Sequence, residues 1–331
     1  MIKDNVLDLT NIVEQFKGKR VFVLGDVTLD KFTEGQVTKI SPEAPVPLVD
    51  IFSESYRLGA AANVMNNINA LGGDVFLTTV VGDDPEGIHL RRLLTKVGSD
   101  TNGIINVEAR NTTVVNRVRV DDQQLLRLDR SGNDPLDSKV SSRILTYLDK
   151  IIKDMDVILI ADYGRGVISQ EIVSAVTKNA KNHGKKIVVN PKKENFHYYR
   201  GVDVIRTNKR EAKYVTGIEL INETSMRIMG QKIISSLDCN SVLITWVEEG
   251  IHLFQNDNEF SFLPPLVNRA VDVTGVGDVI TCALALSLAT GANFETAAKI
   301  SNYAGAIASS KQGLSAVSQK ELKESIIRGL S

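Results

Sequence analysis

Short apolar runs alternate with amphipathic stretches along most of the chain, and their order predicts the fold. Compact apolar runs bounded by turn residues are typical of buried strands, whereas longer stretches repeat apolar residues at helical spacing. Strands are predicted at residues 20–25, 75–81, 157–161, 186–190, 203–206, 241–246 and 251–254. Helices are predicted before Gly18 and at about 60–71, 85–97, 136–153, 169–182, 208–216 and 222–236, with three more from residue 279 onward. This alternation predicts an α/β fold with a mostly parallel sheet covered on both faces.

Two segments break the alternation and predict a second, smaller sheet. Residues 32–52 mix polar and apolar positions, have strand-like ends and contain three prolines between residues 42 and 47. Residues 112–120 and 124–128 alternate in polarity around Asp121-Asp122, which is typical of a β-hairpin. We expect the first segment and the hairpin to pair as one small sheet, attached to a single domain that spans residues 1–331.

The bulk composition excludes several classes of function. With 39 Lys and Arg against 40 Asp and Glu, the formal net charge of the 331 residues is -1, so no global field attracts nucleic acid. No apolar run approaches the roughly 20 residues that span a bilayer, so we expect a soluble cytoplasmic protein without a membrane partner. Cys239 and Cys282 are far apart and predict core packing, not a disulfide or a zinc site. The histidines show no spacing typical of a catalytic or metal site.

The most informative stretch for chemistry is Asp272-Val-Thr-Gly-Val-Gly-Asp278, which joins a strand-like segment to an apolar helix. Gly275 and Gly277 flank Val276 and let consecutive N–H groups point into one concavity at the helix N-terminus, which suits an anion. A carboxylate beside an anion is unfavourable unless it has a chemical role, so Asp278 is a candidate general base next to a phosphate. The alternative is a strand-to-helix turn with a capping Asp.

Polar residues collect where the predicted strands end, the edge at which parallel sheets bind ligands. Asp26 and Asp30 follow the first strand, and carboxylates accept hydrogen bonds from sugar hydroxyls, although a surface turn would also explain them. Gly59 and Asn63 lie at the start of a helix rich in small residues, where either a ligand or close helix packing would fit.

Three cations are candidates for contact with a phosphate, and each has the alternative of an ordinary surface role. Arg165 and Lys192 follow predicted strands, and Lys39 lies in the proline-containing segment. Asn208 and Glu211 open a helix after another strand, where Glu211 could instead be a simple capping residue.

Taken in order, these stretches resemble the ribokinase-like, PfkB-type carbohydrate kinases over nearly the whole chain. Within that family, several motifs are similar to the kinases of ADP-heptose synthesis, which phosphorylate O1 of D-glycero-β-D-manno-heptose 7-phosphate. Independent motifs in one order are more specific than Gly-x-Gly-Asp alone. The motifs are Gly25-Asp-Val-Thr-Leu-Asp-Lys31, Ile40-Ser-Pro-Glu-Ala-Pro-Val-Pro47, Asn116-Arg-Val-Arg119 with Gln123-Gln-Leu-Leu-Arg-Leu-Asp129, and Asp162-Tyr-Gly-Arg-Gly166.

The resemblance implies a role for each candidate residue. Asp278 would be the catalytic base, and the anion hole would comprise Gly275, Val276 and Gly277. ATP would lie near Asn208, Glu211, Thr245, Gly275, Gly277 and Asn302, with Mg²⁺ held indirectly by Glu211 and a monovalent cation as a further cofactor. The substrate would contact Asp30, Gly59, Asn63, Lys39, Arg165 and Lys192. The small sheet would be a β lid through which two copies pair as a homodimer.

The chain departs from the usual family pattern at several positions in these motifs. An extra methyl group at Ala60, where the family usually has Gly, would narrow the sugar pocket, and the bulk of Val276 in place of Ala would alter the anion hole. The other departures are Val279 for Thr, Asn190 for Asp and Val247 for a small residue near the nucleotide.

The resulting prediction is an ATP- and Mg²⁺-dependent kinase that makes heptose 1,7-bisphosphate for ADP-heptose and lipopolysaccharide precursor synthesis. One alternative is a PfkB-type kinase of another sugar or sugar phosphate. Another is a binding protein that kept the pocket and lost catalysis. Bifunctional relatives carry a nucleotidyltransferase domain with a His-x-Gly-His motif, which this sequence does not contain, so we expect the kinase alone.

Overall fold

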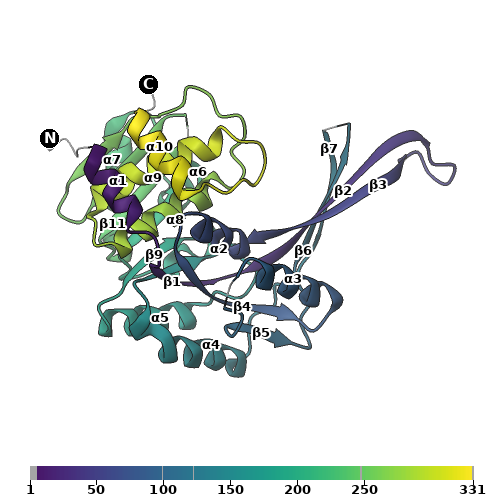
Figure 1. Ribbon diagram of the computed structural model, residues 1–331, viewed down its shortest axis with the longest axis horizontal. Coiled ribbons are helices and arrows are strands. Elements are labelled where there is room, and N and C mark those ends of the chain that lie inside the picture. The colour runs from purple at the N-terminus through teal and green to yellow at the C-terminus, as the bar shows by residue number, and fades with distance from the viewer. Residues whose placement is uncertain (1–5, 99, 122, 247, 330–331) are drawn as a thin grey trace.

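A nine-stranded sheet forms the centre of the computed structural model, which describes residues 6–329 apart from 99, 122 and 247 (Figure 1). The strand order is β13-β12-β11-β10-β9-β8-β1-β4-β5. Neighbouring strands from β5 to β11 run parallel, whereas β12 is antiparallel to β11 and β13 is antiparallel to β12. The strands are β1 (Arg20–Gly25), β4 (Asp74–Gly82), β5 (Ile104–Val107), β8 (Val157–Ala161), β9 (Lys186–Asn190), β10 (Val204–Asn208), β11 (Ser241–Trp246), β12 (Gly250–Gln255) and β13 (Phe260–Leu263).

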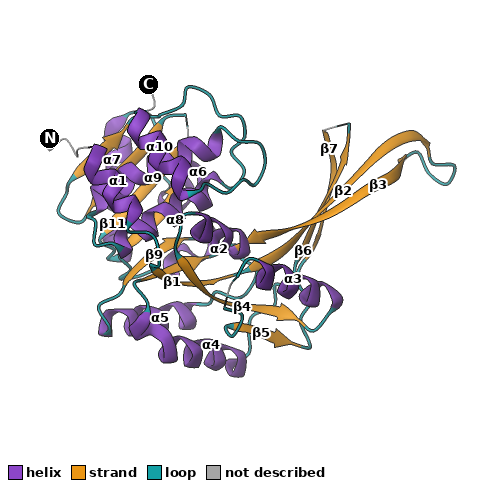
Figure 2. Ribbon diagram, viewed as in Figure 1, coloured by secondary structure: helices purple, strands orange, loops and turns teal. Residues whose placement is uncertain are grey.

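Helices cover both faces of the sheet, which confirms the predicted architecture (Figure 2). Val21 and Val23 of β1 belong to one buried core, while Phe22 and Leu24 belong to the other, so this strand is apolar on both faces. One layer contains α1 (Val6–Glu14), α2 (Ala61–Ala70), α3 (Pro85–Lys96), α8 (Val276–Ala289), α9 (Phe294–Ser309) and α10 (Gln319–Arg328). The other contains α4 (Ser138–Ile151), α5 (Gln170–Asn182), α6 (Lys209–Thr216) and α7 (Glu223–Leu237).

Four further strands form the predicted small sheet, which projects from the body as a β lid (Figure 1). Its order is β3-β2-β6-β7, where β2 (Val27–Ile40) pairs with β3 (Pro47–Ala60), and β6 (Val114–Val120) forms a hairpin with β7 (Gln123–Arg130). The lid is larger than predicted because β2 begins one residue beyond β1 and β3 continues to the start of α2. Asp122, in the predicted hairpin turn, lies outside the described residues.

Two edge strands, β5 and β13, were not predicted from the sequence. Each has four residues, which is too short to show a reliable period, and each is defined by its pairing with β4 or β12. Both cysteines are buried, as predicted. No helix in the described part of the chain is both long and apolar enough to cross a membrane.

Candidate active site

The turn before α8 has the geometry of an anion site. Gly275 adopts φ 75° and precedes the first helical residue, a left-handed conformation that favours glycine. Among the described residues, the N–H groups of Gly275 and Gly277 have no hydrogen-bond acceptor. These donors lie at the positive end of the helix dipole, so the turn can bind a negatively charged group.

Asp278 lies in the first turn of α8, and its side chain is held from two sides. The hydroxyl of Tyr163 donates to Oδ1 at 2.6 Å, and Nδ2 of Asn63 donates to Oδ2 at 2.8 Å. Asp278 is only 9% exposed. Burial raises the pKa of its carboxyl group, and the bonds from Tyr163 and Asn63, together with the charge of Arg206, oppose that rise. An oriented carboxylate of raised basicity is suited to accept a proton.

Asp26 positions the loop that carries Tyr163. Its carboxylate accepts hydrogen bonds from the backbone N–H groups of Tyr163 at 2.9 Å, Arg165 at 3.1 Å and Val167 at 2.9 Å. Asp26 is therefore committed to the loop after β8. The sequence placed Asp26 after a strand but gave no signal for this contact, which joins residues more than 130 positions apart.

Asp30, Gly59 and Asn63 come together at the base of the lid. Asp30 is buried and accepts hydrogen bonds from the hydroxyl of Thr28 at 2.7 Å and from Nη1 of Arg117 at 2.8 Å. A Cβ atom on Gly59 would lie 2.2 Å from Oδ1 of Asp30, so only glycine fits there. The charge of Asp30 also contributes to the raised pKa of Asp278, which places the two carboxylates in one electrostatic environment.

A cleft of about 340 Å³ opens beside the α8 turn. Asn208, at the end of β10, and Thr245, near the end of β11, both line it. Asn302 and Thr245 line a narrower cavity next to it, where Nδ2 of Asn302 donates to the carbonyl of Pro264 at 2.9 Å. The other residues of the cleft are Arg206, Arg210, Trp246, Glu248, Val273, Val276 and Gly277. Val247 lies outside the described residues.

Glu211 has the capping geometry that the sequence left as an alternative. Its Oε2 accepts from the backbone N–H of Asn208 at 3.1 Å and from the hydroxyl of Thr207 at 3.2 Å, while the Asn208 side chain accepts from the N–H of Glu211. This reciprocal pair is a capping box at the start of α6. The second oxygen, Oε1, makes no hydrogen bond to any residue in the described ranges.

The predicted cations occupy different places. Arg165 donates to Asp129 at 2.9 Å and to the hydroxyl of Ser131. Hydrogen bonds from Arg127 and Arg165 lower the pKa of Asp129 to about 2. Lys192 is exposed and packs beside Gly164, in the same loop as Arg165.

Lys39, a predicted substrate contact, lies far along the lid from the other residues predicted to bind the substrate. Lys39 lies nine residues beyond Asp30 on β2, and a strand rises by roughly 3.3 Å per residue, so the two are separated by about 30 Å. Lys39 is exposed and is the second-last residue of β2, which ends at Ile40. The sequence did not reveal how far the lid extends from the body.

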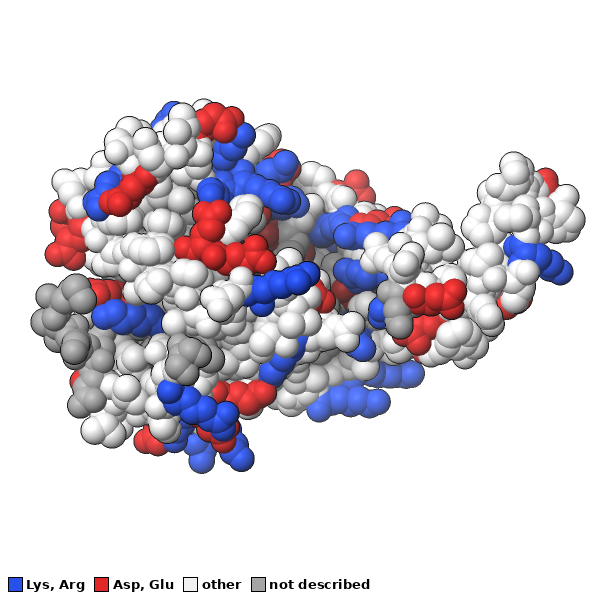
Figure 3. All heavy atoms as spheres, turned by 90° about the horizontal axis from the view of Figure 1, so that it is seen from above, with Lys and Arg blue, Asp and Glu red and all other residues white. Residues whose placement is uncertain are grey.

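Several arginines of the lid, which were not predicted as phosphate contacts, line a cavity next to the body. A cavity of about 210 Å³ lies between lid and body, and Figure 3 shows basic side chains around the hollow between these parts. Arg117 and Arg119 share one face of β6, because alternate residues of a strand point the same way. The cavity is lined by Phe32, Glu34, Ser55, Arg57, Arg117, Arg119, Gln124, Asp272, Thr274, Gln312, Gly313 and Leu314.

Comparison with known protein families identifies the family of the chain. The family described as "pfkB family carbohydrate kinase" matches residues 21–321. The chain belongs to this family. It is therefore a phosphotransferase that acts on a sugar hydroxyl, as the sequence motifs predicted.

Curated relatives of this carbohydrate kinase are named "Bifunctional protein HldE". The protein from Geotalea uraniireducens (strain Rf4) is 35% identical over 303 residues, which cover 92% of this chain and 62% of the relative. The protein from Helicobacter hepaticus (strain ATCC 51449 / 3B1) is 34% identical over 310 residues, covering 94% of this chain and 64% of the relative. The kinase thus spans about three fifths of the length of these relatives.

Solved structures confirm the ribokinase-like fold. Phosphofructokinase-2 from Escherichia coli in complex with substrates and products has a TM-score of 0.76 at 20% identity, covering 93% of this chain and 99% of that one. Ribokinase from Arabidopsis thaliana complexed with ribose and ATP has a TM-score of 0.73 at 16% identity, covering 95% and 99%.

Ala60 shows what a departure from the family pattern does to the kinase backbone. It adopts φ 55° and ψ -130°, a region that glycine enters easily and other residues enter at a cost of about 1–3 kcal/mol. Ala60 ends β3 and precedes α2, which carries Asn63. The strain therefore lies between the lid and a residue that holds Asp278. Val276 and Val279 are both buried, so much of their bulk packs into the core.

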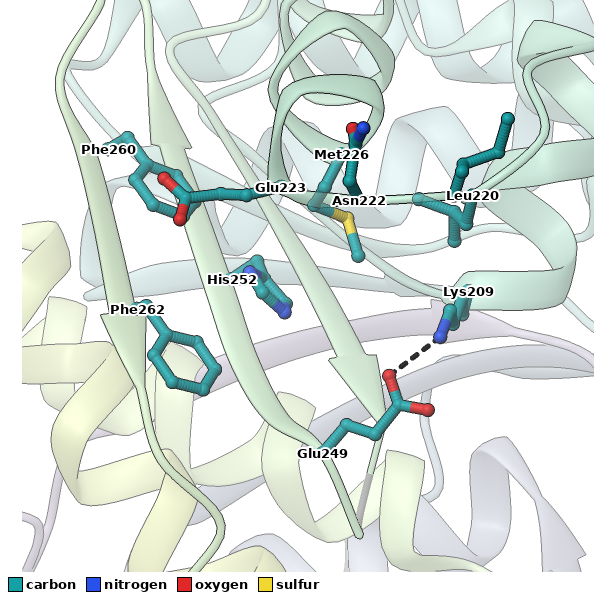
Figure 4. Close-up of a pocket in the computed structure, with 10 residues that line it drawn as sticks. Lys209, Leu220, Asn222, Glu223, Met226, Glu249, His252, Phe260 and Phe262 are labelled. Carbon is teal, nitrogen blue, oxygen red and sulfur yellow. Dashed lines mark hydrogen bonds and ion pairs between the residues drawn. The ribbon is translucent and has the colours of Figure 1, made fainter.

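A second cavity of about 370 Å³ lies on the opposite face of β12 (Figure 4). His252 faces this cavity, whereas its neighbour Ile251 belongs to the core on the other side. Lys209 and Glu249 form an ion pair of 2.6 Å at its edge. The remaining lining residues are Leu220, Ile221, Asn222, Glu223, Met226, Phe260 and Phe262.

Proposed function

We propose that this kinase uses ATP to phosphorylate O1 of D-glycero-β-D-manno-heptose 7-phosphate. The observation that carries the proposal is the buried carboxylate of Asp278, hydrogen-bonded to Tyr163 and Asn63, beside two unpaired amides at a helix N-terminus. The motifs that resemble heptose 7-phosphate kinases and the similarity to HldE proteins support the choice of sugar.

In the proposed reaction, Asp278 accepts the proton of the attacking sugar hydroxyl. The sugar oxygen then forms a bond to the γ-phosphorus of ATP as the bond from that phosphorus to the bridging oxygen breaks, and ADP leaves. The N–H groups of Gly275 and Gly277 donate to the transferring phosphoryl group, next to Val276 in the same turn. Positioning and charge stabilisation supply most of the rate enhancement in such a reaction.

The sugar would lie between the lid and the body. Asp30 and Asn63 would bind its hydroxyl groups, and Gly59 leaves the space for them. The arginines at the lid cavity, Arg57 and Arg117, are the residues we propose for the 7-phosphate, since a guanidinium binds phosphate through two parallel hydrogen bonds. Arg165 and Lys192 would contribute positive charge from the loops after β8 and β9.

The nucleotide would occupy the cleft beside β10 and β11, near Asn208, Thr245 and Asn302. Within the described residues, no group of three His, Cys, Asp or Glu side chains could hold a metal directly. Glu211, with one oxygen uncommitted, fits the indirect role of holding water ligands of Mg²⁺. Mg²⁺ would neutralise charge on the phosphates when bound. Phosphofructokinase-2 from E. coli has been solved with potassium, and a monovalent cation is part of the proposal here.

The lid would also join two copies into a homodimer. Apolar side chains on the lid are exposed: Ile40 is 62% exposed, Ile51 57%, Phe52 73% and Leu128 51%. Apolar groups at this density on a projecting sheet are typical of a protein contact. Light scattering of the purified chain would give twice the 36.2 kDa mass of one copy if this is right.

The decisive experiment measures ADP release with ATP, Mg²⁺ and a panel of acceptors. The panel contains heptose 7-phosphate, heptose, fructose 6-phosphate and ribose, and Asp278→Asn serves as the background control. We expect the highest kcat/KM with heptose 7-phosphate. A preference for another acceptor would replace the proposed sugar. If none of the acceptors gave ADP release, the non-catalytic alternative would be favoured.

A further inference from the structure

Arg206 lies directly behind the anion-binding turn. It is the third residue of β10, and its guanidinium crosses to both neighbouring strands. Nη2 donates to the hydroxyl of Thr245 on β11 at 2.6 Å, and Nη1 lies 3.4 Å from the side-chain oxygen of Asn190 on β9. A Cβ atom on Gly277 would lie 2.5 Å from Nη1, so the glycine allows the guanidinium to approach the turn closely.

The charge of this guanidinium is not paired. No carboxylate of a described residue lies within 4.0 Å of it in an ion pair, and its hydrogen-bond partners, Thr245 and Asn190, are neutral. Its Nε is buried and makes no hydrogen bond. Burial lowers the pKa of Arg206, while the charges of Glu211 and Asp278 favour the protonated form. A partly buried cation without a counter-ion is unfavourable, because neither water nor an opposite charge fully compensates it.

Other half-buried arginines of the chain show the contrast. Arg117 forms an ion pair with Asp30, and Arg165 forms one with Asp129. Arg110 donates to the backbone carbonyls of Asp134 and Arg165. Arg206 differs from these because it lines the cleft that contains the α8 turn. An anion that enters this cleft would satisfy both the guanidinium and the amides of Gly275 and Gly277.

We propose that Arg206 is a further catalytic residue, which contacts the transferring phosphoryl group of a nucleoside triphosphate from the side of β10. It rests on the proposed function, because the transferring group is assigned to this turn by that reaction. The guanidinium donates to phosphoryl oxygens and keeps its proton throughout, while Asp278 accepts the proton of the sugar. The sequence gave no signal for this role, because Arg206 reads as the end of a buried strand.

The kinetic test replaces Arg206 by Ala and by Lys, with Arg143→Gln as a matched control that removes an exposed cation on α4, outside the cleft. We expect Arg206→Ala to lower kcat on the order of 100-fold or more, with a smaller change in KM for the sugar. Arg206→Lys keeps the charge without the planar fork and should lose roughly tenfold. Arg143→Gln should stay within about twofold.

Chemical rescue separates a catalytic from a merely structural role. Added guanidinium ion at non-denaturing concentration should restore part of the activity of Arg206→Ala and leave that of Arg143→Gln unchanged. A variant that lost activity through misplacement of β9, β10 and β11 would gain nothing. Circular dichroism and thermal unfolding identify a variant that does not fold, and Arg206→Lys then carries the test.

A binding measurement keeps this proposal distinct from the proposed function. Trp246 is the single tryptophan of the chain and lines the cleft, so its fluorescence can report nucleotide binding without turnover. We expect Arg206→Ala to weaken ATP at least roughly tenfold and to leave AMP nearly unchanged. That result with no turnover of any sugar would support Arg206 and reject the proposed function. Full kcat and unchanged ATP affinity in a folded Arg206→Ala variant would overturn the role of Arg206 alone.

Discussion

Two cavities of similar volume lie on opposite faces of the same sheet edge, and they differ in charge balance. The cleft beside α8, of about 340 Å³, contains Arg206 without a carboxylate partner. The cavity of Figure 4, of about 370 Å³, has its cation, Lys209, paired with Glu249. In that cavity His252 packs against Phe262 with ring centroids 4.8 Å apart, so these two lining side chains contact each other. Volume alone therefore does not separate a reactive site from a gap between packed side chains.

Positive backbone φ angles occur near the α8 turn and not in the walls of either cavity. None of the residues that line the two cavities has a positive φ, whereas Ala60, before α2, and Gly275, before α8, do. Unpaired charge and strained backbone both raise the free energy of the folded protein, and functional sites are where such features usually occur. The contrast between the two cavities can be tested by measuring how substitutions change kinase activity and the free energy of unfolding.

The largest effect is expected from Asp278→Asn, which removes the proposed base and keeps the size of the side chain. kcat should fall by roughly 100- to 10,000-fold, the range for loss of a positioned general base. The pKa of Asp278 is raised in the folded protein, so ionisation of this carboxyl opposes folding above its ordinary pKa of 3.8. Loss of the charge therefore favours folding at neutral pH, and loss of the hydrogen bond from Tyr163 or Asn63 to the replaced oxygen opposes this gain. Activity close to that of the parent would remove Asp278 from its role.

Tyr163→Phe should have a smaller effect on activity than Asp278→Asn and should change how kcat/KM depends on pH. The Tyr163 hydroxyl stabilises the charged form of Asp278, so its loss raises the pKa of that carboxyl further. Because the base must be ionised, the acidic limb of log kcat/KM should shift to higher pH. The measurement is a pH–rate profile with saturating ATP, and a shift to lower pH would contradict this account of the site.

Ala60→Gly should relieve strain next to the active site. Relief of about 1–3 kcal/mol is partly offset by the larger entropy of glycine in the unfolded chain, which costs about 0.5–1 kcal/mol. We expect a net gain of about 1 kcal/mol in the free energy of unfolding, measured by urea denaturation. Ala60→Val is the matched opposite, since a branched side chain tolerates positive φ poorly. Equal stability of the three proteins would show that Ala60 carries no strain.

The smallest effect is expected on the other face of the sheet. Glu249→Gln breaks the ion pair with Lys209. Because the Glu249 side chain is half exposed, the free energy of unfolding should change by less than about 1 kcal/mol. Kinase activity should remain within about twofold, because this cavity is separated from the α8 turn by the sheet. A large loss of kcat would show that the two cavities are coupled and would break the contrast between them.

Local patterns in the sequence predicted the features that depend on neighbouring residues. The turn around Gly275 and Gly277, the carboxylate of Asp278 and the alternation of strands and helices all follow from spacing within a few positions. The proximity of Asp30 to Gly59 could be inferred only through the resemblance, because it depends on the pairing of β2 with β3.

Contacts across the sheet could not be predicted in this way. Arg206 meets Asn190 and Thr245 because β10 lies between β9 and β11, an order that no local pattern contains. Tyr163 reaches Asp278 across 115 positions of the chain. The distance of Lys39 from Asp30 could not be predicted for the same reason, since it is set by the length of β2.

The direct continuation of β1 into the lid has a mechanical consequence. Asp26 alone separates β1 from β2, and β3 passes into α2 without a linker, so both connections between the lid and the body are direct. Ile40 lies 14 residues from Asp26 along β2 and Asp30 lies 4, so a rotation about Asp26 would displace the tip of the lid about three and a half times as far as the carboxylate of Asp30. Force applied by a partner at the tip would reach Asp30 amplified by the same ratio.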